Sequence, residues 1–122
     1  MSFRVPLNQR CPDMQSPDTL SPAFLTVWEF VVPESTRSRF EQVYGPAGAW
    51  AQLFLRDPAY LGTELLHDLQ TPGRYLTLDR WASEAAYQAF RGRFCDAYAA
   101  LDRECEALTE RETRVGSFTT FP

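Results

Sequence analysis

A change of hydrophobic period within residues 74–90 constrains the fold of this chain more than any other feature. The segment RYLTLDRW alternates between two faces, as a β-strand does, and SEAAYQAF then places apolar residues one helical turn apart. Ser83 stands at the change, where its hydroxyl can cap a helix that begins at Glu84. This stretch therefore predicts a strand over 74–81 that leads directly into a helix.

The same patterns along the rest of the chain predict four strands and two helical regions. The first helical region is expected to break at Gly45-Pro46, and the middle strands are expected to form a β-hairpin around Thr71-Pro72-Gly73. The order β-α-β-β-α-β is that of the ferredoxin-like fold, an α+β architecture in which a four-stranded antiparallel sheet carries both helices on one face. The predicted strands are 24–32, 59–70, 74–81 and 113–121, and the predicted helical regions are 34–56 and 84–110.

The chain is expected to hold one domain. Its 122 residues fit a single domain, and the proline-rich residues 1–23 show no periodic pattern, so we predict an N-terminal arm followed by a ferredoxin-like domain over 24–122. The N-terminus has no apolar core of a secretory signal, and the sequence has no apolar run long enough to span a bilayer. We therefore expect a cytoplasmic protein without a membrane partner.

Charge and cysteine usage exclude further classes of function. The net charge of -4 argues against nucleic acid as a partner. The three cysteines, Cys11, Cys95 and Cys105, stand at irregular spacing and form no metal-binding pattern, so we expect reduced thiols and no metal site. Apolar residues on both faces of the predicted strands suggest that a second subunit covers the free face of the sheet, which predicts a homodimer.

Four stretches of the sequence resemble the antibiotic biosynthesis monooxygenase family, within the dimeric α/β-barrel superfamily. They are WEF at Trp28, YGPAGAWAQLF at 44–54, YLGTELL at 60–66 and YLTLDRWASEAAYQAF at 75–90. The resemblance covers roughly residues 24–120. It implies a ligand cavity between the sheet and the helices of each subunit, and a dimer barrel on the other face of the sheet.

The family includes haem-degrading proteins and cofactor-free oxygenases, and the residues distinguish the two. Haem degraders resemble this chain at Trp81 but need an iron-ligating histidine on the following helix, where this chain has Arg91 and Phe94. The only histidine, His67, lies on the preceding strand. The resemblance thus disfavours haem degradation and implies a monooxygenase that uses O₂ and no cofactor on an aromatic, polyketide-like or quinol-like molecule.

The cofactor-free branch implies Trp81, Tyr87 and His67 as its catalytic residues. The indole N–H and the phenol O–H would hold a substrate oxygen, and the imidazole would act as base. Each also has a structural interpretation, as a core anchor, a flank of the helix stripe and a packed polar side chain. A two-residue hairpin loop would turn His67 away from Trp81, whereas a longer loop would place both on one side.

Several other side chains are candidates to contact the substrate. Thr77 stands where the family has an asparagine, and Trp50 is a core position that could also border the cavity. Asp79, a carboxylate on the strand face that carries Trp81, needs a partner if it is buried. We expect first an ion pair with Arg80, Arg91 or Arg114, and second a catalytic acid or base. A non-catalytic small-molecule-binding or stress-response protein is the alternative function. The candidate substrate-binding residues are Thr77, Asp79, Trp28, Trp50 and Phe90.

Overall fold

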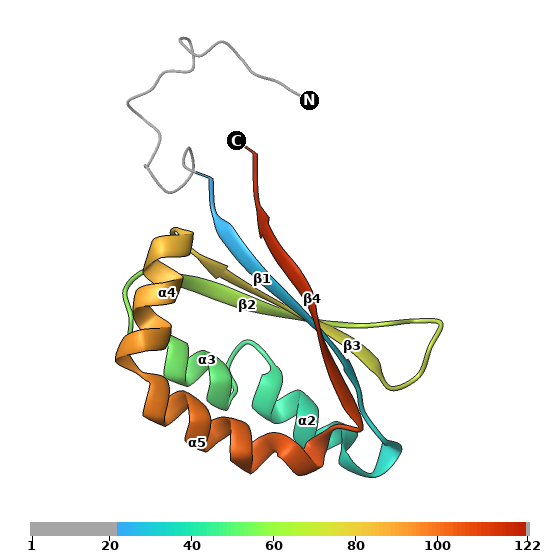
Figure 1. Cartoon of the computed structure of the whole chain (residues 1–122). Coiled ribbons are helices and arrows are strands. Elements are labelled where there is room, and N and C mark those ends of the chain that lie inside the picture. The colour runs from blue at the N-terminus through green and yellow to red at the C-terminus, as the bar shows by residue number, and fades with distance from the viewer. Residues whose placement is uncertain (1–21, 122) are drawn as a thin grey trace.

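A computed structural model describes residues 22–121 of the chain (Figure 1). The predicted arm over 1–23 therefore lies almost entirely outside the described residues. The described part confirms the α+β ferredoxin-like fold: four strands form one antiparallel sheet in the order β2-β3-β1-β4. The strands are β1 (Phe24–Val31), β2 (Tyr60–His67), β3 (Arg74–Trp81) and β4 (Arg111–Thr119).

Both helical regions are divided. The first begins with a 3-10 turn and breaks between Tyr44 and Ala49, as the Gly45-Pro46 pair predicts. The second was expected to be one helix over 84–110, and this is wrong, because Phe94 leaves the helical conformation with φ -111° and ψ 29°. Its elements are η2 (Glu34–Thr36), α2 (Arg37–Tyr44) and α3 (Ala49–Phe54) in the first region, and α4 (Glu84–Arg93), α5 (Cys95–Cys105) and η3 (Glu106–Leu108) in the second.

The local signal at the strand-to-helix change is confirmed in detail. β3 ends at Trp81, and the Ser83 hydroxyl accepts a hydrogen bond of 3.0 Å from the backbone N–H of Ala86. Ser83 thus caps α4, as its position in the sequence predicts. None of the helices within residues 22–121 is long and apolar enough to cross a membrane.

The hairpin between β2 and β3 has the longer of the two loops considered. His67 pairs with Tyr75, and the Asp68 N–H donates to the Arg74 carbonyl at 2.9 Å, so residues 69–73 form the loop. Because directly paired residues point to the same face of a sheet, His67 lies on the helix-covered face together with Tyr75. This register also places Thr63 opposite Asp79.

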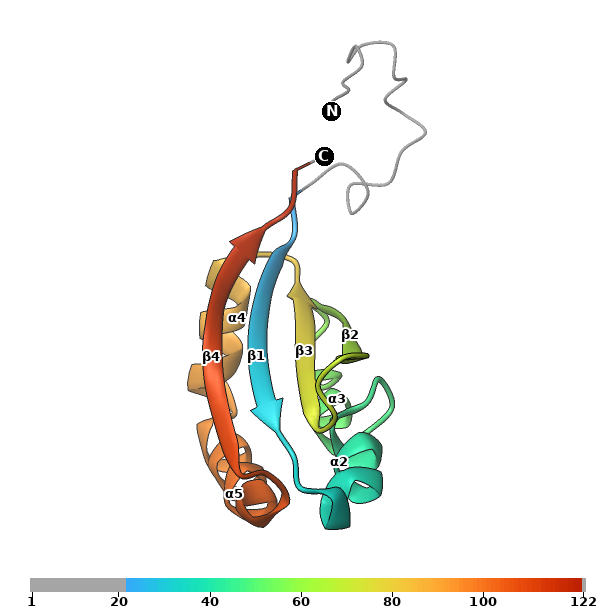
Figure 2. The same ribbon diagram turned by 90° about the vertical axis from the view of Figure 1, so that its right-hand side faces the viewer.

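The helices all pack on one face of the sheet, as Figure 2 shows with the sheet lying in front of them. Aromatic rings fill the space between the two layers. Near one end of β1, the rings of Phe40 and Tyr44 stack with their centres 4.3 Å apart, and Phe30 packs against both. Near the other end, Trp81 and Phe90 are fully buried and their ring centres lie 5.0 Å apart.

The opposite face of the sheet is apolar, and no element within residues 22–121 covers it. Alternation along the paired strands assigns to this face residues that include Leu66, which is 44% exposed, and Phe118, which is 49% exposed. Two ion-paired groups on the same face flank the apolar residues. The apolar residues of this outer face include Leu25, Val27, Val31, Leu66, Leu76, Leu78 and Phe118.

Candidate active site

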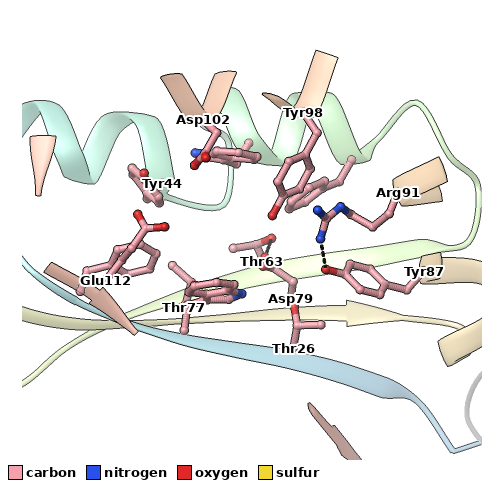
Figure 3. Close-up of a pocket in the computed structure, with 14 residues that line it drawn as sticks. Thr26, Tyr44, Thr63, Thr77, Asp79, Tyr87, Arg91, Tyr98, Asp102 and Glu112 are labelled. Carbon is pink, nitrogen blue, oxygen red and sulfur yellow. Dashed lines mark hydrogen bonds between the residues drawn. The ribbon is translucent and has the colours of Figure 1, made fainter. Parts of the chain in front are cut away.

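A cavity of about 270 Å³ lies between the helix-covered face of the sheet and the helices. All four strands and all four α-helices contribute to its lining (Figure 3). Small-molecule sites in proteins usually occupy roughly 300–1,000 Å³, so this cavity suits a compact ligand. Its aromatic walls come from β1 and α3 and consist of Trp28, Phe30, Trp50 and Phe54.

Asp79 forms part of the cavity floor and is held by hydroxyl groups. Its side chain is 9% exposed, and the Thr63 hydroxyl on the adjacent strand donates to its Oδ1 at 2.5 Å. The hydroxyl oxygens of Tyr60 and Thr63 also lie 2.5 Å apart. Because the Thr63 proton is given to the carboxylate, the Thr63 oxygen accepts from Tyr60. The result is an ordered chain of two hydroxyl groups that ends on a buried carboxyl group.

The first interpretation of Asp79, a structural ion pair, is wrong. Within the part of the chain that the structure describes, no arginine reaches ion-pair distance of this carboxylate. Burial raises the pKa of Asp79 to about 6, while the hydrogen bond from Thr63 acts in the opposite direction. This geometry favours the second interpretation, an acid or base. The three arginines considered as partners, Arg80, Arg91 and Arg114, instead contact Glu64, Tyr87 and Ser117, respectively.

One end of the cavity is a corner of hydrogen-bond donors. Arg91 Nη1 donates to the Tyr87 hydroxyl at 3.1 Å, and the Arg91 guanidinium carbon lies 3.9 Å from the centre of the Tyr98 ring. Burial raises the pKa of Tyr98 to about 12, so its phenol remains a neutral donor. Figure 3 shows the guanidinium and both hydroxyl groups gathered on one side of the cavity, above Asp79.

The other end of the cavity is acidic. Tyr44, Asp102 and Glu112 lie there, on α2, α5 and β4 (Figure 3). Partial burial, followed by the nearby carboxylates of Asp102 and Glu106, raises the pKa of Glu112. Burial also raises the pKa of the Tyr44 hydroxyl. The cavity therefore differs in charge from end to end, with a cation at the Arg91 corner and carboxylates at the Glu112 end.

The predicted aromatic residues separate into two groups. Tyr87, Trp28 and Trp50 line the cavity, whereas Trp81 and Phe90 do not and have no exposed surface. The Trp81 ring packs with four aromatic rings at centre distances of 5.0–5.4 Å, and its indole Nε1 has no hydrogen-bond partner among the described residues. Trp81 therefore supports the wall behind Tyr87 and has no direct access to a ligand in this cavity.

His67 lies on the cavity side of the sheet but not in the cavity lining. Its ring is exposed and stacks on Tyr75, with ring centres 4.3 Å apart and planes 6° from parallel. The Tyr75 hydroxyl donates to Glu41 at 2.5 Å. The geometry therefore does not bring His67 together with Tyr87. Of the remaining predicted contacts, Thr77 and Asp79 both line the cavity and are buried.

Seven polar residues of the cavity lining were not among the site residues predicted from sequence: Thr26, Tyr44, Thr63, Arg91, Tyr98, Asp102 and Glu112. Thr63 lies between leucines on one face of β2. This position indicates a polar contact only when the residue that faces Thr63 on the neighbouring strand is known. Tyr98, Asp102 and Glu112 reach the cavity through the packing of α5 and the register of β4. No group of three His, Cys, Asp or Glu side chains within residues 22–121 could hold a metal ion.

Comparison with solved structures shows the same fold in several proteins. SnoaB from Streptomyces nogalater, described as a cofactor-independent oxygenase, matches 80% of this chain and 92% of its own with 24% identity and a TM-score of 0.60. A Pseudomonas aeruginosa protein matches 84% of this chain and 96% of its own with 12% identity and a TM-score of 0.56. A conserved Methanosarcina mazei protein matches 85% and 95% with 10% identity and a TM-score of 0.56. At these identities the similarity establishes the fold alone.

Sequence comparison defines the family. No curated protein matches the chain. Residues 24–100, more than half of the chain, match the family described as antibiotic biosynthesis monooxygenase. This range contains the strands β1, β2 and β3, all of α2, α3 and α4, and most of the residues that line the cavity. The chain therefore belongs to the antibiotic biosynthesis monooxygenase family.

Proposed function

We propose that this protein is a cofactor-independent monooxygenase that acts with O₂ on a compact aromatic molecule of the polyketide or quinol type. Membership of the family and the shared fold with an oxygenase support monooxygenase chemistry. The observation that carries the proposal is Asp79, a buried carboxyl group without a cationic partner among the described residues, in the floor of an aromatic cavity.

The proposed reaction begins with proton abstraction by Asp79. The ionised carboxylate takes a proton from an acidic position of the substrate, and the resulting electron-rich anion passes one electron to O₂. Combination of the two radicals forms the carbon–oxygen bond. For a CH₂ group that becomes C=O, the substrate loses two hydrogens and gains one oxygen atom, and the second oxygen atom leaves as water.

Asp79 is better suited than His67 to act as this base. A general base is most effective when its pKa lies near the working pH and its side chain reaches the proton. With a pKa of about 6, Asp79 is largely ionised at neutral pH while retaining proton affinity, and it borders the cavity. The exposed His67 ring does not line this cavity. Tyr87 remains a candidate to orient the substrate, and Trp81 becomes a positioning residue for Tyr87.

Oxygen consumption tests the proposed function. Purified protein should take up O₂ in the presence of one or more members of a panel of anthrone-like phenols and quinols, and the uptake should persist after treatment with a chelator. Mass spectrometry with ¹⁸O₂ should place one labelled oxygen in the product. Absence of uptake across the panel, together with saturable binding of the same compounds, would instead support a non-catalytic small-molecule-binding protein.

Thr63→Val is expected to move the acidic limb of the pH–rate profile to higher pH. The hydrogen bond from the Thr63 hydroxyl stabilises the ionised form of Asp79, so its loss raises the pKa of that carboxyl group further. Thr63→Ser keeps the hydroxyl and serves as the matched control. Carbon-13 NMR titration of the Asp79 carboxyl group measures the pKa directly. Equal titration curves for the valine variant and the wild type would contradict this role.

We also propose that the apolar outer face of the sheet forms a homodimer interface. The central pair Val27 and Leu78, which is partly exposed, would be buried there together with the exposed Leu66 and Phe118, and clusters of exposed apolar side chains often mark protein–protein interfaces. Wild-type protein should sediment as a dimer at micromolar concentration, and Leu78→Glu should sediment as a folded monomer. Leu55→Glu, at a position that is 59% exposed and lies away from this face, should remain dimeric. A monomeric wild type would contradict the proposal.

A further inference from the structure

Arg91 forms no ion pair within residues 22–121. The ion pairs of the described residues involve Arg74, Arg80 and Arg93, but not Arg91. Its Nη1 donates to the Tyr87 hydroxyl, whereas its Nε is buried and has no hydrogen-bond partner among the described residues. The cavity lining includes Arg91, and hydrogen bonds to a charged group are stronger than those between neutral groups. A ligand acceptor that reaches the guanidinium from the cavity would therefore be bound favourably at this corner.

The surroundings of Arg91 hold the guanidinium in place. Its carbon lies 3.9 Å above the centre of the Tyr98 ring, and the Tyr87 hydroxyl accepts from one of its nitrogens. A stacked guanidinium still presents N–H groups at its edge, and their planar arrangement suits an anionic oxygen. In Figure 3 the Tyr87 and Tyr98 hydroxyl groups lie on the same side of the cavity as the guanidinium, which adds two further potential donors at this corner.

The negative charge at the end of the cavity opposite Arg91 favours one orientation of a bound ligand. Asp102 and Glu112 line that end, and neither forms an ion pair among the described residues. Like charges repel in a partly desolvated site, so an anionic group of a ligand is disfavoured beside these carboxylates. A ligand with one anionic oxygen is thus expected to place it at the Arg91 corner and its uncharged rings between the aromatic walls.

We propose that Arg91, Tyr87 and Tyr98 form an oxyanion-binding site, and that the substrate of this protein is an acidic phenol or enol bound through its ionised oxygen. This proposal deepens the proposed function and rests on it for the reaction, though binding itself requires no turnover. In that reaction the substrate O–H proton passes to the Asp79 carboxylate, and the negative charge that Asp79 loses appears on the oxygen beside Arg91. The total charge of the cavity is unchanged.

Binding of a phenolate that is not a substrate for oxygenation tests the site. The probes are 4-nitrophenol, used above the pH at which it ionises, and 4-nitroanisole, its uncharged analogue. Quenching of the tryptophan fluorescence from Trp28 and Trp50 reports occupancy of the cavity. Arg91→Gln is expected to weaken binding of the phenolate by about 10- to 100-fold, since hydrogen bonds to charged groups contribute strongly to affinity. Its affinity for 4-nitroanisole should change little.

Two further variants make the outcome decisive. Arg103→Gln removes the same charge from an exposed position on α5 and should leave both affinities unchanged. Arg91→Lys keeps the charge without the planar fork and should retain part of the preference for the phenolate, even if Arg91→Gln folds poorly. Equal loss for both probes, or no loss for either, would overturn the oxyanion site. Binding of the phenolate that depends on Arg91, without O₂ uptake on any substrate, would sustain this inference and refute the proposed function.

Discussion

Asp79→Asn is expected to lower kcat for oxygen uptake by roughly 100- to 10,000-fold, which is the usual contribution of a general base. The substitution keeps the shape of the side chain, and the amide oxygen can still accept the hydrogen bond from Thr63. It removes only the ability to take a proton. In the wild type, kcat should rise with pH through about 6, where Asp79 ionises. Asp96→Asn, at an exposed position on α5, is the matched control and should retain full activity.

The same substitution is expected to stabilise the protein at neutral and alkaline pH. Burial raises the pKa of Asp79 to about 6 in the folded protein, above its ordinary value of 3.8. Below pH 3.8 the carboxyl group is protonated in both the folded and the unfolded state, and folding carries no penalty from its ionisation. Between 3.8 and 6 the unfolded chain releases this proton first, so stability falls as the pH rises, and the loss is complete above about pH 6.

The size of this effect follows from the difference between the two pKa values. Wild-type protein should lose about 3 kcal/mol of unfolding free energy across this range, and Asp79→Asn should avoid that loss. Urea denaturation at about pH 8 should then show the variant to be the more stable protein, with the advantage gone at about pH 4. A variant that is less active and also less stable at both values would show that Asp79 is a structural residue. Lower activity with higher stability is the pattern expected of a base held in an unfavourable environment.

Periodicity was sufficient to predict the fold because each element carries its own local signal. The alternation in β3, the Ser83 cap and the Gly45-Pro46 break are properties of adjacent residues, and all three are present in the structure. The break at Phe94 could not be predicted in this way, because no local sequence signal marks it. The apolar stripe continues across it, and only the backbone angles of Phe94 divide α4 from α5.

The site could be predicted only in part because its contacts join distant segments. The family resemblance, which includes the local spacing of Trp81 and Tyr87, implies Tyr87 as a site residue, and the cavity lining includes it. The link from Thr63 to Asp79 depends on the register of the hairpin, and the lack of an ion pair at Asp79 within residues 22–121 depends on where three arginines point. A sequence shows which side chains can ionise, whereas the packing of the elements determines which of them are left without a partner.

Trp81 is the residue for which sequence and structure lead to the most different expectations, and its substitution separates them. As a fully buried ring among four other aromatic rings, Trp81 should contribute mainly to stability. Trp81→Ala is expected to reduce the unfolding free energy by about 3–5 kcal/mol, because it removes a large side chain and leaves a cavity behind. Thermal and urea denaturation measure this loss.

Trp81→Phe keeps most of the ring packing and removes an indole N–H that has no partner in the described residues. Oxygen uptake per folded molecule should therefore remain close to that of the wild type. Trp28→Phe is the matched control, because Trp28 lines the cavity and its substitution should change KM with little effect on stability. Loss of turnover in Trp81→Phe at an unchanged melting temperature would require the indole to contact the substrate. In that case the cavity would have to open toward Trp81 when a ligand binds, and the catalytic role that the family resemblance implies for Trp81 would be restored.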